Sequence, residues 1–297
     1  MTDDPAFLLG APRSGTSLVY KLLCLHPRAA WLSNYVRRAP AVPWLGVLNR
    51  LAAVNPERRR AVWFGPGGGD AYAYGRPRSA SERLFPQPVE GEPVFAHHGI
   101  SDDPAVAPPP GAVAGLARTF EQVRRSAGGR LLVNKRIANN GRVGMLADAF
   151  PGARFVRITR DGRAVAASLA VVDWWRSSPV WWYGGTPERW AATGGDPLAL
   201  CAEHWVREVG RLERQVADHG VEVLDVRYED VVAEPVAVLA ALAEHVGLGP
   251  EDRRWRDELG TVRFPDRTDG WRSRLNRAEV DLIEEIQGPT LARLGYR

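Results

Sequence analysis

Cysteine and lysine are scarce in this chain of 297 residues. The two cysteines, Cys24 and Cys201, lie far apart, and neither belongs to a Cys-x-x-Cys pair or a histidine cluster. This excludes a disulfide framework and a structural zinc site. Lysine occurs at only two of the 39 basic positions, Lys21 and Lys135. In a chain that uses arginine almost everywhere else, each lysine raises the question of whether its compact ammonium group is chemically required.

Long apolar runs are also missing. No segment approaches the roughly 20 apolar residues that a membrane-spanning helix needs. The acidic start, Met1-Thr-Asp-Asp-Pro, lacks the cationic beginning of an export signal, so we expect a cytoplasmic protein without a membrane partner. The net charge of +4 favours anionic ligands. The arginines are spread along the chain without a known nucleic-acid module, so we expect no nucleic-acid partner.

The ordered parts of the sequence alternate between strand-like and helix-like segments. Strands are expected near 6–10, 131–134, 154–158 and 221–226, with helices over 17–25, 140–150, 162–172, 201–218 and 235–246. This order predicts an α/β fold, a P-loop-type three-layer sandwich whose mostly parallel sheet has helices on both faces. Since no repeat is present, we expect one domain over 1–297. Residues 37–110 are rich in proline and glycine and are expected to form an irregular insertion on the substrate side.

The clearest motif is Gly10-Ala-Pro-Arg-Ser-Gly-Thr-Ser17, between the first strand and the first helix. Backbone N–H groups in such a loop, with the helix N-terminus, can wrap an oxyanion. Its spacing matches the nucleotide-triphosphate loop except that Thr16 replaces the lysine that reaches the outer phosphates. A cation stands earlier, at Arg13. The loop therefore suits a phosphate ester whose charges differ from those of ATP.

Two further motifs follow strands. Arg160-Asp-Gly-Arg-Ala-Val-Ala-Ala-Ser168 offers a guanidinium fork and a hydroxyl for a second phosphate, or else simply caps a helix. Leu131-Leu-Val-Asn-Lys135 places a lysine at the same edge of the sheet, for function or for an ion pair. Lys21 is expected on the surface of the first helix.

In this order the three motifs resemble those of sulfotransferases that use 3′-phosphoadenosine 5′-phosphosulfate (PAPS), above all the tyrosylprotein-type and related bacterial branch. The family pattern Pro-Arg-Ser-Gly-Thr-Thr is matched by Pro12-Arg-Ser-Gly-Thr-Ser17. Later matches are Asn134-Lys135, Phe150-Pro151 and Arg160-Asp-Gly-Arg-Ala164, with weaker ones at Tyr228-Glu229 and Leu294-Gly-Tyr296. The resemblance covers 6–36 and 131–296 but not the middle of the chain.

The resemblance implies roles for individual residues. It assigns the 5′-phosphosulfate to Arg13, Ser14, Gly15, Thr16 and Ser17, the 3′-phosphate to Arg160 and Ser168, and a place near the nucleotide to Tyr228. It gives Arg13 and Lys135 the stabilisation of charge during sulfuryl transfer. It implies no metal. The implied activity is transfer of a sulfuryl group from PAPS to a hydroxyl or amine of a small molecule, such as a natural product. A tyrosine-type protein sulfotransferase, a P-loop kinase or NTPase, and a basic nucleic-acid-binding protein are the alternatives.

One position departs from the family. Tyrosylprotein-type enzymes carry a glutamate base where this chain has Asn34, and an asparagine cannot accept the proton. Either the acceptor needs no base, or the base lies elsewhere. His97 and His98 are the leading candidates because histidine titrates near neutral pH, with Glu90 and Glu92 as weaker ones.

Tryptophan is concentrated after the second motif, between Trp174 and Trp190. Such a cluster offers flat surfaces to an acceptor, or forms a packed corner of the core. The candidates for acceptor binding are Asn34, Trp174, Trp175, Trp181 and Trp182. A loop that covers the nucleotide is expected from Arg267, Trp271 or Arg272. The identity of the acceptor and the oligomeric state stay open.

Overall fold

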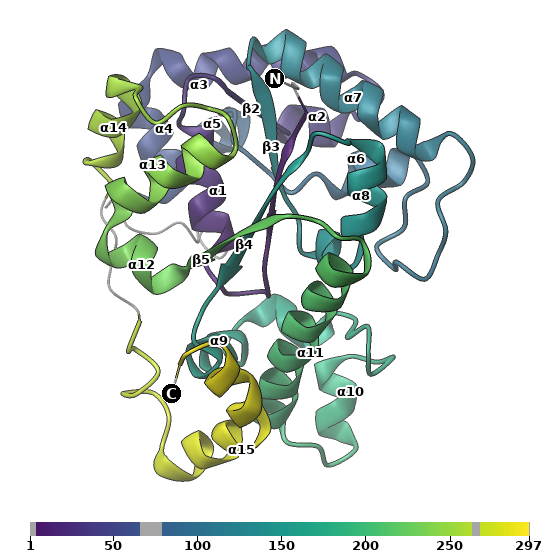
Figure 1. The fold of residues 1–297 in the computed structure, drawn as a ribbon, viewed down its shortest axis with the longest axis vertical. Coiled ribbons are helices and arrows are strands. Elements are labelled where there is room, and N and C mark those ends of the chain that lie inside the picture. The colour runs from purple at the N-terminus through teal and green to yellow at the C-terminus, as the bar shows by residue number, and fades with distance from the viewer. Residues whose placement is uncertain (1–3, 66–78, 263–267, 297) are drawn as a thin grey trace.

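The computed structural model describes residues 4–65, 79–262 and 268–296 (Figure 1). Its centre is a five-stranded sheet in the order β2-β3-β1-β4-β5, and every neighbouring pair is parallel. The strands are β1 (Ala6–Leu9), β2 (Ala29–Trp31), β3 (Leu131–Lys135), β4 (Arg154–Thr159) and β5 (Val223–Arg227). The predicted α/β class with a mostly parallel sheet is confirmed.

The central strand β1 is apolar along its whole length because both of its faces are covered. Phe7 and Leu9 pack on one side of the sheet, and Ala6 and Leu8 on the other. Parallel neighbours bring the carboxyl ends of β1, β3 and β4 to one edge, for example by pairing Leu8 with both Lys135 and Val156. That edge is where parallel α/β folds bind their ligands.

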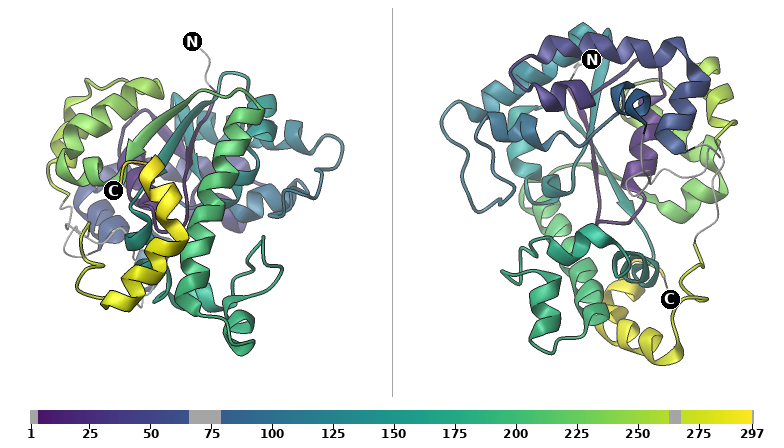
Figure 2. Two further views of the ribbon diagram at one scale, coloured as in Figure 1. Left: turned by 60° about the horizontal axis from the view of Figure 1, so that its bottom comes forward. Right: turned by 180° about the vertical axis from the view of Figure 1, so that it is seen from behind.

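Helices form a layer on each face (Figures 1 and 2). One face carries α1 (Thr16–Cys24), α4 (Pro56–Phe64), α12 (Tyr228–Ala233), α13 (Pro235–His245) and α14 (Arg253–Leu259). The other carries α7 (Ala112–Ala127), α8 (Val143–Ala149) and part of α11 (Pro197–Asp218). Of the helices within the described residues, none combines the length and the apolar composition needed to cross a membrane.

A further group of helices lies beyond the carboxyl edge of the sheet (Figure 1). It contains α9 (Gly162–Leu169), η3 (Asp173–Ser177), α10 (Pro187–Ala192), the start of α11, and α15 (Arg277–Arg293). Their shared core includes Leu169, Trp175, Leu200 and Ile283. These helices extend the protein past the sheet on the side where the sequence motifs converge.

The structure corrects the expectation for residues 37–110. The described part of this segment is largely helical, with the end of α2 (Asn34–Arg38), η1 (Pro43–Asn49), α3 (Arg50–Val54), α4, α5 (Ala80–Leu84) and α6 (Glu92–His97). Most of these elements are too short for helical periodicity to show. Their signals are local caps, such as the Asn55 side chain at the start of α4 and the Ser79 capping box of α5. Residues 67–69, three consecutive glycines, lie outside the described residues.

Other boundaries shift for similar reasons. The helix expected over 140–150 is divided into η2 (Ile137–Gly141) and α8, and the helix expected over 162–172 ends at Leu169. The short strand β2 was missed because three residues carry too little pattern.

Candidate functional site

The loop between β1 and α1 has the tight backbone that its sequence predicts. Within the described residues, Arg13 is the one non-glycine residue in the left-handed region, with φ of 70°. Gly15 has φ of 87°, and a Cβ atom there would lie 2.2 Å from the Tyr228 ring. A non-glycine residue held in this region is a form of strain that concentrates at functional sites. The loop is therefore folded closely around the start of α1.

The start of α1 is open to an anion. Its N-cap, Gly15, has no side chain to bond the first N–H groups, and no acidic residue occupies the first turn, which begins with Thr16 and Ser17. The Ser14 hydroxyl is buried and has no hydrogen-bond partner among the described residues. Free N–H groups, the helix dipole and an unsatisfied hydroxyl are the features that hold an oxyanion.

Residues from the second motif lie directly against this loop. Arg13 Nε donates to Ser168 Oγ over 2.9 Å. Arg160 Nη1 donates to the Arg13 carbonyl over 3.1 Å, and the Arg160 guanidinium lies 4.3 Å from the centre of the Tyr228 ring. Burial lowers the pKa of Arg160, so a bound anion would compensate a charge that the fold has desolvated. Four predicted nucleotide residues thus form one cluster.

The weaker matches of the sequence frame this cluster. The Glu229 carboxylate accepts hydrogen bonds from the Asp161 backbone N–H over 3.1 Å and from the Tyr296 hydroxyl over 3.0 Å. Arg163 Nη2 donates to the Tyr296 carbonyl over 2.9 Å and to the Asp161 carboxylate over 2.8 Å. These contacts fix the start of α9, which carries Ser168. Sequence spacing alone could not assign this framework role.

Lys135 forms a buried ion pair that links two distant segments. It lies at the end of β3, is 4% exposed, and its Nζ donates to a carboxylate oxygen of Glu90. The other oxygen accepts from the Ile137 N–H over 3.4 Å, and the Glu90 carbonyl accepts from Asn134 Nδ2 over 3.2 Å. The carboxylate is therefore held at the carboxyl end of β3, beside the rare lysine. Lys21 is also buried, donating to the Trp63 carbonyl over 2.6 Å, so its expected surface position was wrong.

Asn34 holds the segment that leads to Glu90. Its Nδ2 donates to the carbonyls of Arg83 and Phe85 over 3.0 and 3.2 Å. Its Oδ1 accepts from the Gln87 N–H over 3.1 Å. The amide that replaces the family glutamate is thus engaged with backbone groups three to seven residues before Glu90. Its contact with an acceptor stays a prediction.

The comparison with known proteins agrees with this arrangement. The model of the family described as "Sulfotransferase family" matches residues 5–252. The chain belongs to the sulfotransferase family. The match includes the loop, Lys135, Arg160 and Tyr228. No curated protein matches the sequence closely enough to count as a relative.

Solved structures support the fold of this sulfotransferase. Sulfotransferase STF9 from Mycobacterium avium aligns with a TM-score of 0.60 and 16% identity, covering 99% of this chain and 77% of the other. Sulfotransferase STF1 from Mycobacterium tuberculosis aligns with a TM-score of 0.53 and 19% identity, covering 96% and 76%. A sulfotransferase domain from the curacin biosynthetic pathway aligns with a TM-score of 0.51 and 14% identity, covering 96% and 97%.

The two candidate histidines of the sulfotransferase lie near α7. His98 bonds the Thr119 hydroxyl over 2.9 Å, and a Cβ atom at Gly115 would lie 2.6 Å from its Nδ1. Burial, then His97 and Arg118, lower its pKa. His97 is exposed, and its ring is 5.0 Å from that of His98. None of these contacts joins a histidine to Lys135, so the catalytic role predicted for His97 and His98 has no geometric support here and stays a prediction.

The tryptophans divide between core and surface. Trp175 is buried, and its ring lies 4.7 Å from that of His204. Trp182 is partly buried and donates to His204 Nδ1 over 3.2 Å. These two complete a packed corner, whereas Trp174 and Trp181 are 41% and 42% exposed. The exposed pair has surface to offer an acceptor.

The C-terminal candidates for a loop that covers the nucleotide also differ in burial. Trp271 is buried against Ala164 and Ala167 of α9. Arg272 lies 4.5 Å from the centre of the Trp271 ring and is exposed. Arg267 lies outside the described residues. Trp271 therefore packs on the helix that carries Ser168, where a covering segment is expected.

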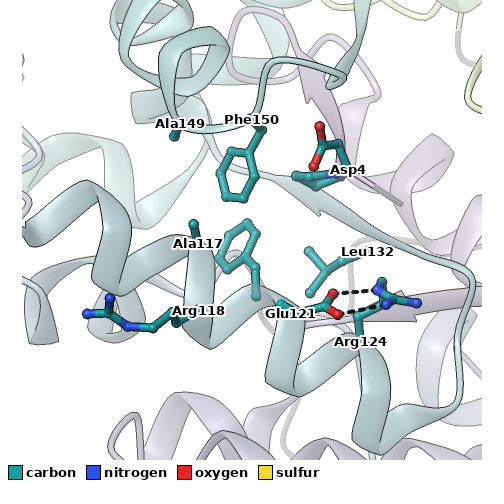
Figure 3. Close-up of a pocket in the computed structure, with 10 residues that line it drawn as sticks. Asp4, Ala117, Arg118, Glu121, Arg124, Leu132, Ala149 and Phe150 are labelled. Carbon is teal, nitrogen blue, oxygen red and sulfur yellow. Dashed lines mark hydrogen bonds and ion pairs between the residues drawn. The ribbon is translucent and has the colours of Figure 1, made fainter. Parts of the chain in front are cut away.

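A hollow of about 430 Å³ lies at the opposite edge of the sheet (Figure 3). It is lined by Pro5, before β1, by Leu132 at the start of β3, and by Phe150 at the end of α8. The Glu121 carboxylate at its side is held by Arg124, whose hydrogen bonds lower its pKa. Because the hollow lies at the amino ends of the strands, it is separate from the candidate site.

Proposed function

We propose that this sulfotransferase moves a sulfuryl group from PAPS to a hydroxyl or amine of a small molecule. The observation that carries the proposal is the cluster of Arg13, Arg160, Ser168 and Tyr228 around the uncapped start of α1. It offers two anion anchors close together, as a nucleotide with phosphate groups on both its 5′ and 3′ positions requires. Thr16, in place of the lysine of triphosphate loops, argues against ATP or GTP.

The residues present fit this donor. Ser14, Gly15, Thr16 and Ser17 would hold the 5′-phosphosulfate with N–H and hydroxyl groups. Arg160 and Ser168 would hold the 3′-phosphate, and Tyr228 would lie beside the nucleotide. PAPS supplies the sulfuryl group when bound, together with a leaving oxygen on its 5′-phosphate.

The pair of Glu90 and Lys135 supplies acid–base and electrostatic groups. We assign Glu90 as the base that takes the proton of the acceptor, because it is the carboxylate at the carboxyl edge of β3. The Lys135 ammonium lies against this carboxylate and, with Arg13, would place positive charge where the leaving oxygen gains negative charge. No metal is part of the proposal.

A small-molecule acceptor is favoured over a protein tyrosine. The base comes from a different segment than in the tyrosylprotein-type enzymes, and the solved structures similar to this chain include a domain of a biosynthetic pathway. A cytoplasmic location and the absence of a nucleic-acid partner belong to the same proposal.

Transfer of label from sulfur-35 PAPS to a panel of phenols, alcohols and amines tests the proposal. We expect a labelled product and an equal amount of adenosine 3′,5′-bisphosphate. Tyrosine-containing peptides in the panel test the protein-directed alternative. Label transfer from γ-phosphate-labelled ATP, with none from PAPS, would contradict the proposal.

A further inference from the structure

We propose that Arg136, Arg142 and Arg211 form a binding site for an anionic group carried by the acceptor. The inference rests on the proposed function, because it names the chemical class of the second substrate. The three arginines come from the end of β3, the start of α8 and the middle of α11. Along the chain, Arg136 and Arg142 lie between Lys135 and Arg160, Arg211 lies between Ser168 and Tyr228, and none of the three is among the predicted nucleotide residues.

Arg136 is the residue that follows Lys135. It is 2% exposed, and its guanidinium lies 4.4 Å from the centre of the Phe95 ring. Its Nη2 contacts the carboxylate of Asp102, which is on an exposed loop. Its Nε and Nη1 are buried and have no hydrogen-bond partner among the described residues. Two donors beside the proposed reacting groups are thus unsatisfied.

Arg142 offers an oxyanion two unpaired nitrogen atoms on one guanidinium group. It is 5% exposed, and both Nε and Nη2 are buried without a hydrogen-bond partner in the described part of the chain. These two nitrogens form the planar fork that binds a carboxylate or phosphate with two parallel hydrogen bonds. A buried fork without a partner is costly in a folded protein. An anionic ligand would satisfy it.

Arg211, on α11, is the third residue of the proposed anion site. Its guanidinium lies 4.5 Å from the centre of the exposed Trp181 ring. A Cβ atom at Gly141 would lie 1.8 Å from Arg211 Nη2, so the absence of a side chain at Gly141 makes room for this guanidinium. Nη2 is buried and has no hydrogen-bond partner within residues 4–65, 79–262 and 268–296.

The pKa values of the arginines also support an anion site. Burial and then Arg142 lower the pKa of Arg136 to about 10, while burial and then Arg211 lower that of Arg142. The arginines are therefore close enough to repel one another. The acids that oppose them are incomplete partners. Glu92 and Glu90 favour the charged form of Arg136 but bond neither its Nε nor its Nη1, and Asp102 and Asp103 lie on an exposed loop. The nearest buried acid, Glu208, is 3.8 Å from Arg211 Nη1 and already accepts from Trp181 Nε1 over 2.6 Å and Asn140 Nδ2 over 2.8 Å.

The position of the cluster defines the acceptor. Arg136 directly follows Lys135, whose ammonium pairs with Glu90, so the proposed base and the arginine site are adjacent. A molecule whose hydroxyl or amine reaches Glu90 can place a second group among the arginines, alongside the exposed Trp181 ring. The acceptor is therefore a small molecule that carries a carboxylate, phosphate or sulfate in addition to its nucleophile.

The first test measures binding and needs no turnover. Adenosine 3′,5′-bisphosphate is added to saturation, which reports on the nucleotide site separately, and inorganic phosphate is then titrated while the melting temperature is followed. We expect phosphate to raise the melting temperature of the wild type and of Arg277→Gln, an exposed arginine on α15. Arg142→Gln and Arg211→Gln should lose most of this rise. Arg142→Gln removes a buried cation whose Nε and Nη2 have no hydrogen-bond partner in the described residues, so it should not melt below the wild type without phosphate. Arg211→Gln also breaks the ion pair with Glu208, so its rise is measured from its own phosphate-free melting temperature.

If phosphate raises the melting temperature equally in the wild type and in all three variants, the arginine site is overturned. This holds whether or not the nucleotide binds. If the wild type responds to phosphate but does not bind adenosine 3′,5′-bisphosphate, the proposed function is contradicted and the arginine site is not. If Arg142→Gln does not fold, the arginine is structural and the site is overturned, unless Arg211→Gln folds and loses the response.

The second test separates an acceptor-borne group from a free anion. The dissociation constants of 3-hydroxybenzoate and 3-hydroxybenzamide, which differ in charge but share a phenol, are compared by calorimetry. We expect the acid to bind at least tenfold more tightly to the wild type, and the ratio to approach one in Arg142→Gln. Equal binding of acid and amide to the wild type, with phosphate still bound, would overturn the assignment to the acceptor and leave a free-oxyanion site.

Discussion

The proposed nucleotide side and the proposed acceptor side of the site are built by different means. On the nucleotide side, the loop at Arg13 and the helix carrying Ser168 each come from one continuous motif, and the strands bring the motifs together. On the acceptor side, Glu90 reaches Lys135 from 45 residues earlier in the chain, and Asn34 holds the segment that delivers it. A motif indicates functional groups that are close together in the sequence. An ion pair between distant residues, such as Glu90 and Lys135, produces no recognisable sequence pattern.

The two sides also differ in the partners of their charged side chains. Arg160 lies against the loop carbonyl and the Tyr228 ring, and the surrounding framework of Glu229, Arg163 and Tyr296 is mutually hydrogen-bonded. The acceptor side leaves donor nitrogens of Arg136 and Arg142 without hydrogen-bond partners in the described residues. The framework of the nucleotide side is thus fixed by its own hydrogen bonds, whereas the Ser14 hydroxyl on that side and the arginine nitrogens on the acceptor side would find their partners in a ligand.

The largest expected effect comes from removing the proposed base. Glu90→Gln keeps the size of the side chain but cannot accept a proton, so the turnover number should fall by about 10²–10⁴-fold. Affinity for adenosine 3′,5′-bisphosphate should stay near the wild-type value. Steady-state kinetics and calorimetry measure the two quantities. Glu92→Gln, two residues away on α6, is the matched control and should retain activity. Equal loss in both variants would show that Glu90 has no special role.

Lys135→Arg tests whether a compact ammonium is required. The substitution keeps the charge, yet a guanidinium is broader and the site is buried. The single-turnover rate should fall by about a hundredfold or more, the scale of one positioned electrostatic contact, while PAPS affinity is largely kept. Wild-type turnover by this variant would remove Lys135 from the mechanism and would make the rarity of lysine a coincidence.

Arg160→Ala probes the nucleotide side alone. Loss of its charge-assisted contact should weaken binding of adenosine 3′,5′-bisphosphate by about 1.5–3 kcal/mol. Adenosine 5′-phosphate, which lacks the 3′-phosphate, should bind the variant and the wild type similarly. Calorimetric titrations with both nucleotides make the comparison. If both ligands lose the same affinity, Arg160 does not recognise the 3′-phosphate.

The smallest expected effect separates His98 from catalysis. Burial lowers the pKa values of His26, His98 and His204 below that of an unfolded histidine, near 6.5. As the pH falls below 6.5 the unfolded chain gains protons that the folded protein does not, so stability should decrease. His98→Asn should reduce this acid dependence, measured by urea unfolding between pH 7 and 5, without changing the pH profile of activity. Loss of one limb of the activity profile would instead identify His98 as the base.

The sequence predicts most of the sheet, and the convergence of its motifs at one edge, because both depend on local patterns. The apolar run at β1, the turn residues around Gly15 and the cap at Asp161 each specify their own structure. The short helices of 37–110 were predicted as irregular because their signals are single caps. Histidines His97 and His98 were preferred over Glu90 on intrinsic pKa alone, and nothing in the sequence indicates that Asn34 and Asn134 anchor the Glu90 segment. Arg136, Arg142 and Arg211, too, are separated in sequence and are hard to distinguish within an arginine-rich composition.

The relative affinities for two nucleotides decide whether this protein uses PAPS or a nucleoside triphosphate. The wild-type protein is titrated by calorimetry with adenosine 3′,5′-bisphosphate and, under the same conditions, with ATP in the presence of Mg²⁺. The two anchors at Arg160 and the loop, together with the missing triphosphate lysine, predict that the bisphosphate binds at least tenfold more tightly. Equal or tighter binding of ATP would contradict the account of this protein as a PAPS-dependent sulfotransferase.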